Sequence, residues 1–153
     1  MVYGIISHLD NETTRAFFRN KKVPDANVVY NTQLSALAQT LKAGDAVYVV
    51  SVNRFATVSQ FMNFGKFCMA NGVSLHLLAQ PYLDISSGKH WKPAFVNQMM
   101  QMVDVERRAI GHMVRGFRMT SEQWEYVYRC FEVMNLEVLG HTFSADGMLK
   151  RGS

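Results

Sequence analysis

The chain has 153 residues, of which 48% are hydrophobic and 18% are charged, with three prolines and ten glycines. This composition supports a buried core and excludes a disordered, collagen-like or linker-dominated chain. No apolar run is long enough to span a membrane, and residues 1–10 lack a basic segment followed by a cleavage signal, so we expect a cytoplasmic protein. The net charge of +4 permits nucleic-acid binding but does not establish it.

The first three quarters of the chain alternate short apolar runs with amphipathic segments. The apolar runs predict strands over residues 2–7, 28–30, 46–52 and 73–78. The amphipathic segments predict helices over residues 13–20, 33–42, 58–71 and 93–117. The run at 46–52 is apolar on both faces, which is typical of a central parallel strand. This regular alternation predicts an α/β domain with a mostly parallel sheet.

The helix predicted over residues 93–117 is longer than such a domain is wide. It carries one apolar, methionine-rich stripe that includes Met99, Met102, Val103, Ile110, Met113, Val114 and Phe117. A stripe of this length needs a partner surface. Packing on the sheet is one interpretation, and self-association through an adaptable methionine-rich surface is the other. We expect the second, which gives a homodimer or homotetramer.

The chain changes character after Gly116, so we place a domain boundary between residues 117 and 118. A helix capped by Thr120 or Ser121 is predicted to run to about residue 134. Two shorter helices are predicted over residues 136–143 and 145–151. Helices joined by tight turns in this order have the outline of a helix-turn-helix. Residues 118–153 are therefore predicted to be a small, all-helical, DNA-binding tail.

Four segments in order carry a resemblance to a known family. They are YGIIS at residues 3–7, GDAVYVVSVNRF at 44–55, GVSLHLLAQ at 72–80 and VDVERR at 103–108. In this order and spacing they resemble the catalytic domain of the serine recombinases, the resolvase–invertase family, over residues 1–117. The resemblance implies a resolvase-like fold with a long dimerisation helix, and the tail is similar to that family's C-terminal helix-turn-helix.

The resemblance implies a serine nucleophile that attacks a DNA phosphodiester and forms a 5′-phosphoserine link. Ser7 matches that nucleophile, and Arg54 and Arg107 match two of the cations that such a transition state needs. Non-cationic residues stand at the other matching positions: Ile5, Asn31, Thr57 and Met113 replace arginines, and Asn53 replaces an aspartate. Each missing donor costs roughly 10²–10³ in rate, so we expect cleavage to be impaired or absent.

The leading hypothesis is a DNA-binding protein of the serine-recombinase family that acts as a regulator or architectural partner. Its phosphate contacts are predicted at Arg107, Arg108, Arg115, Arg118, Lys150 and Arg151.

Two other hypotheses stay open. One is an active recombinase that uses Ser7 and Arg54, assisted by Arg107 or His8. The other is a protein-interaction module without DNA contact, suggested by the balanced charge of the tail. The register also stays open, because a shift of two residues places Leu9 at the nucleophile position.

The sequence gives no sign of a metal or cofactor. The five histidines show no ligand spacing, and two cysteines are too few for a cysteine-rich zinc site, so we expect both to be reduced thiols. Neither a GxxxxGK[ST] loop nor a GxGxxG motif is present. We therefore expect no metal and no nucleotide cofactor.

Overall fold

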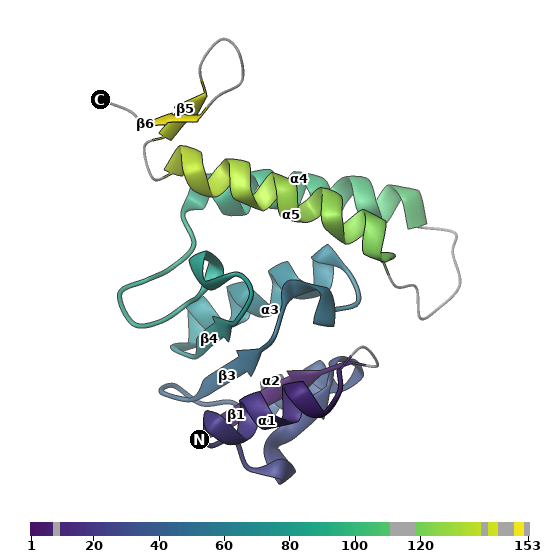
Figure 1. The fold of residues 1–153 in the computed structure, drawn as a ribbon, viewed down its shortest axis with the longest axis vertical. Coiled ribbons are helices and arrows are strands. Elements are labelled where there is room, and N and C mark those ends of the chain that lie inside the picture. The colour runs from purple at the N-terminus through teal and green to yellow at the C-terminus, as the bar shows by residue number, and fades with distance from the viewer. Residues whose placement is uncertain (8–9, 111–118, 139–140, 144–148, 152–153) are drawn as a thin grey trace.

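A four-stranded, all-parallel sheet lies in the lower half of the molecule as drawn in Figure 1. The computed structural model describes residues 1–7, 10–110, 119–138, 141–143 and 149–151, with the backbone alone for 105–110 and from 133 onward. The sheet has the order β2-β1-β3-β4. Its strands are β1 (Val2–Ile6), β2 (Val28–Tyr30), β3 (Ala46–Val49) and β4 (Ser74–Leu77). The predicted α/β class is confirmed, and the run predicted as a central strand is central.

Three helices connect these strands, and their ends follow the capping residues in the sequence. They are α1 (Glu12–Asn20), α2 (Leu34–Thr40) and α3 (Val58–Asn71). The side chain of Asn11 caps α1, and that of Thr57 caps α3. Gly72 ends α3 in the left-handed conformation that favours glycine. Short 3-10 turns η1 (Asp25–Asn27), η2 (Asn31–Gln33), η3 (Val52–Arg54) and η4 (Pro81–Leu83) complete the connections.

The two faces of the sheet are covered unequally. Alternate residues of β3 and β4, such as Val47 and Leu75, are fully buried in the main core with α2 and α3. On the opposite face, Phe18 of α1 packs so closely over β1 that a Cβ on Gly4 would lie 2.9 Å from its ring. Tyr48 of β3 lies on this second face, where it is half-buried and its ring centroid lies 6.3 Å from that of Phe17 in α1.

Two long helices, α4 (Pro93–Ile110) and α5 (Ser121–Val138), lie side by side across α3 (Figure 1). The Phe131 ring of α5 lies 5.8 Å from Phe61 of α3 and 5.8 Å from Phe95 of α4, measured between ring centroids. Met99 and Val103 of α4 are completely buried within this one chain. That part of the apolar stripe therefore already has a partner surface without a second copy. Residues 111–117 of the predicted helix lie outside the described residues, and the dimer stays a prediction.

The tail differs from the expected set of three helices. A single 18-residue helix, α5, extends past the predicted end near residue 134, and two antiparallel strands follow, β5 (His141–Phe143) and β6 (Leu149–Arg151). The helices predicted over 136–143 and 145–151 were wrong where these strands lie. Thr142 and Phe143 favour strand conformation, and Gly147 weakens a helix, so the tail sequence carried little helical preference.

Trp124 and Val127 of α5, together with Phe131, belong to the same core as the sheet. The boundary predicted between residues 117 and 118 lies outside the described residues. Among those described, we find no helix with both the length and the hydropathy of a membrane span.

Candidate functional site

The carboxyl ends of β1 and β3 form the candidate site. These two neighbouring strands flank the point where the chain changes direction, since β2 lies on one side of β1 and β3 on the other. In open parallel sheets, ligands bind at this kind of switch point, beyond the carboxyl ends of the strands. Ser7 directly follows β1, and η3 with Arg54 directly follows β3. The structure thus brings these two predicted residues to the same edge of the sheet.

Asp10 links the two strand ends. Its Oδ1 accepts hydrogen bonds from Arg54 Nε at 2.6 Å and from Thr14 Oγ1 at 2.7 Å, and its Oδ2 accepts one from the backbone N–H of Ser7 at 2.6 Å. The side chains of Asp10 and Arg54 are only 5% and 15% exposed. Such an ion pair is screened little by solvent, and removing either partner leaves a charge in a poorly hydrated place.

Arg54 is held on its other side by asparagines. Its Nη1 donates to Asn53 Oδ1 at 2.8 Å, and its backbone carbonyl accepts a hydrogen bond from Asn31 Nδ2 at 2.8 Å. Gln60 of α3 donates in turn to the Asn31 carbonyl at 3.0 Å. Asn31 and Asn53, which the resemblance marks as lost functional residues, therefore fix the position of the arginine that remains.

A second polar cluster lies beside the first, beneath α5. The Tyr128 hydroxyl lies 3.1 Å from Ser51 Oγ and accepts a hydrogen bond from the Asn53 backbone N–H at 3.2 Å. Gln80, which follows β4, donates to Ser51 Oγ at 3.1 Å and accepts from the Val52 N–H. Burial raises the pKa of Tyr128 above its ordinary value, because it disfavours the ionised phenolate.

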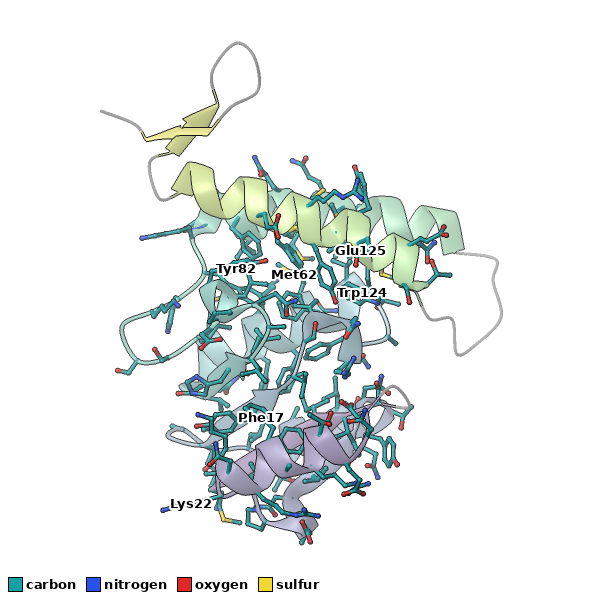
Figure 2. All side chains as sticks on the ribbon, viewed as in Figure 1. Phe17, Lys22, Met62, Tyr82, Trp124 and Glu125 are labelled. Carbon is teal, nitrogen blue, oxygen red and sulfur yellow. The ribbon has the colours of Figure 1, made fainter. Side chains whose placement is uncertain are left out.

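Through Tyr128, the helix α5 contacts the segment that follows β3. Trp124 lies on the side of α5 that faces α3 (Figure 2), and its side chain is buried there. In this arrangement, the polar side chains of Ser51, Gln80 and Tyr128 form hydrogen bonds with one another. This cluster therefore has a structural role, because it connects α5 to the sheet.

The sequence interpretation missed several residues of these clusters. Asp10, Tyr128 and Gln80 were not among the candidate residues. An acidic residue three positions after a strand-end serine, at the start of a helix, was the available signal for Asp10. Tyr128 offered no comparable signal, because its contact to Ser51 spans 77 residues.

The remaining predicted site residues are placed only in part. Arg107 and Arg108 belong to the last turn of α4, and Lys150 and Arg151 to β6, but their side chains lie outside the described residues. Arg115 and Arg118, and also His8 and Leu9, lie outside them altogether. Neither the assisting role of Arg107 or His8 nor the alternative register at Leu9 is tested by the geometry.

At the carboxyl ends of β1 and β3, the charged side chains form an ion pair with little exposure to solvent. Ser7 is 5% exposed, and the guanidinium of Arg54 is bound to a carboxylate. Within the described part of the chain, no three histidine, cysteine or acidic side chains come together as a set of metal ligands. In comparisons with known proteins, no family model matches the chain and no curated protein matches it significantly.

Proposed function

We propose that this chain is a DNA-binding protein of the serine-recombinase type that does not cleave DNA and acts as a regulator or architectural partner. The observation that carries the proposal is the ion pair between Asp10 and Arg54. Ser7 and Arg54 share the edge that a recombinase site needs, but the arginine beside the serine is bound to a carboxylate of the same chain.

This ion pair argues against phosphoryl transfer at Ser7. The transition state spreads negative charge over the phosphoryl oxygens and needs cations directed at them. Arg54 is already paired, and Asp10 places a negative charge where that phosphate has to arrive. With Ile5 and Asn31 in place of two further arginines, little stabilisation of the transition state is left.

Binding to DNA requires neither the serine nucleophile nor the cations that stabilise the transition state. Phosphate contacts from exposed Lys and Arg side chains supply most of the nonspecific affinity, and their number sets its salt dependence. Arg107 and Arg108 follow one another in the last turn of α4, and Lys150 and Arg151 in β6. An antiparallel pair of strands is one of the elements that fit the major groove, which makes β5 and β6 a replacement for the expected helix-turn-helix.

The decisive experiment combines covalent trapping with a native gel shift. The protein and a Ser7→Ala variant are incubated with supercoiled DNA that carries the protein's own flanking locus, and then denatured. We expect no Ser7-dependent adduct. In the native gel we expect a shift that weakens as the salt concentration rises. A Ser7-dependent adduct would instead establish an active recombinase.

A charge-matched pair of variants tests the DNA contacts. Arg107→Gln with Arg108→Gln is compared with Arg19→Gln and Lys22→Gln, which remove the same charge from exposed positions at the end of α1. We expect the first double variant to lose far more affinity and to show a smaller salt slope. Equal losses would refute a specific surface, and the absence of any shift would favour the protein-interaction hypothesis.

A further inference from the structure

We propose that the Asp10 carboxylate is an intramolecular occupant of an oxyanion-binding site, which keeps that site closed to phosphate in the folded protein. The site is built from the Arg54 guanidinium, the Thr14 hydroxyl and the Ser7 backbone N–H, all of which donate to this carboxylate. Its ligand class is a small oxyanion, such as formate or inorganic phosphate. The site would take such an anion whether or not the chain binds DNA.

The three donors come from three separate elements. Ser7 follows β1, Thr14 lies in the first turn of α1, and Arg54 ends η3. All three distances to the carboxylate oxygens are between 2.6 and 2.7 Å. Hydrogen bonds to ionised acceptors are shorter and stronger than those between neutral groups. The positive end of α1 adds a dipole that favours an anion at the same place.

The donors are held in position by contacts other than Asp10. The Asn53 side chain binds the Arg54 guanidinium, and the Asn31 side chain binds its backbone carbonyl. Thr14 is buried, and its backbone N–H is bound by the cap residue Asn11. Removal of the carboxylate would therefore leave a preformed set of donors facing an empty volume, and a buried donor without an acceptor is unfavourable.

A purely structural ion pair and an occupied anion site make different predictions for a variant that lacks the carboxylate. A structural pair predicts only a loss of stability. An anion site predicts that a free oxyanion of suitable size restores stability in a saturable manner, because a ligand that binds only the folded state stabilises it. The restoration must depend on Arg54 and must be absent from the unaltered protein.

The test is chemical rescue of Asp10→Ala, followed by thermal unfolding. Melting temperatures are measured in sodium chloride, sodium formate and sodium phosphate at equal ionic strength. We expect the variant to melt below the unaltered protein in chloride and to regain at least half of the difference in formate or phosphate, with saturation in the millimolar range. Asp25→Ala, which removes an exposed acidic side chain in η1, is the charge-matched control and should show no such recovery.

Three results would overturn the proposal. The first is an Asp10→Ala variant that responds to formate and phosphate no more than to chloride. The second is a recovery that persists in the Asp10→Ala, Arg54→Gln double variant. The third is an Arg54-dependent stabilisation of the unaltered protein by phosphate, which would mean that the site is already open.

If Asp10→Ala does not fold in chloride, its refolding yield is titrated with formate, and an unchanged yield equally refutes the proposal. None of these measurements uses DNA. A failed gel shift therefore refutes the proposed function and leaves this inference standing. A failed chemical rescue refutes this inference and leaves the proposed function standing.

Discussion

The Tyr128 hydroxyl of α5 lies 3.1 Å from Ser51 Oγ, at the carboxyl end of β3. It also accepts a hydrogen bond from the Asn53 backbone N–H, so one phenol joins the tail helix to the candidate site. The contact spans 77 residues and fixes α5 to the part of the chain that carries Arg54. The tail helix therefore contributes to the order of the strand-end edge.

Replacing Tyr128 by phenylalanine removes this hydroxyl and leaves the Asn53 N–H without its acceptor. We expect a loss of about 1–3 kcal/mol in the free energy of unfolding, measured by urea denaturation. Tyr126→Phe is the matched control, because that side chain is 64% exposed on the same helix and should leave the stability unchanged. Equal effects of the two variants would show that the hydroxyl does not anchor α5.

Gly65 of α3 is closely covered by the Trp91 ring, and a Cβ at this position would collide with it. The ring cannot move away easily, because its Nε1 donates to the Leu83 carbonyl at 2.7 Å. Gly65→Ala should therefore destabilise the fold by about 1–3 kcal/mol, although alanine favours helices. The denaturation midpoint and tryptophan fluorescence measure this effect. Lys66→Ala, exposed on the same helix, should change neither, and a stable Gly65→Ala would contradict this packing.

Burial raises the pKa of the Cys68 thiol to about 12, against an ordinary value of 9.0. The folded state holds the thiol proton more tightly than the unfolded state does. The unfolded state therefore loses this proton first, and the free energy of unfolding falls as the pH rises from 9 towards 12. The slope for one such group is at most about 1.4 kcal/mol per pH unit. We expect the free energy of unfolding to fall above pH 9, and to fall less steeply in Cys68→Ala.

Tyr82 adds to the same alkaline loss. Burial, followed by the nearby Glu132, raises its pKa to about 12. A Tyr82→Phe variant should therefore also flatten the slope, but only above about pH 10, where an exposed tyrosine ionises. If stability were independent of pH between 9 and 11 in the unaltered protein, the burial of both groups would be refuted.

Val103 separates the two interpretations of the apolar stripe on α4. Because Val103 is fully buried within one chain, Val103→Ala should cost about 1–3 kcal/mol, and the urea midpoint should not depend on protein concentration. Gln101→Ala, exposed on the same helix, should have little effect. A midpoint that rises over a roughly 100-fold increase in concentration would show that folding is coupled to self-association.

The sheet was predictable because its strands are continuous apolar runs bounded by clear caps. The helix predicted over residues 58–71, for example, spans the same residues as α3 in the structure. The tail was less predictable, because residues 141–143 and 149–151 form strands by pairing with each other. Their hydrophobic residues follow neither the periodicity of a helix nor that of a strand. Tertiary and cross-strand contacts decide such segments, and a local pattern does not contain them.

The site was predictable only in part. Ser7 and Arg54 were singled out through the family resemblance, and the parallel order of β1 and β3 brings them to one edge. The partner of Arg54 was not found, because Asp10 lies 44 residues away and a local pattern does not show contacts over that distance. Asn31 was interpreted as a lost cation, whereas its side chain holds the Arg54 backbone.

The position of β1 has a consequence for how the chain folds as it is made. β1 is synthesised before both of the strands that flank it in the sheet, since it pairs with β2 on one side and β3 on the other. Its apolar residues have no complete sheet to join until residue 49, the end of β3, has emerged from the ribosome. Contacts that distant in sequence form late and slowly. A nascent chain that pauses before that point leaves one edge of β1 without its partner strand, and such an edge is a template for pairing with other chains.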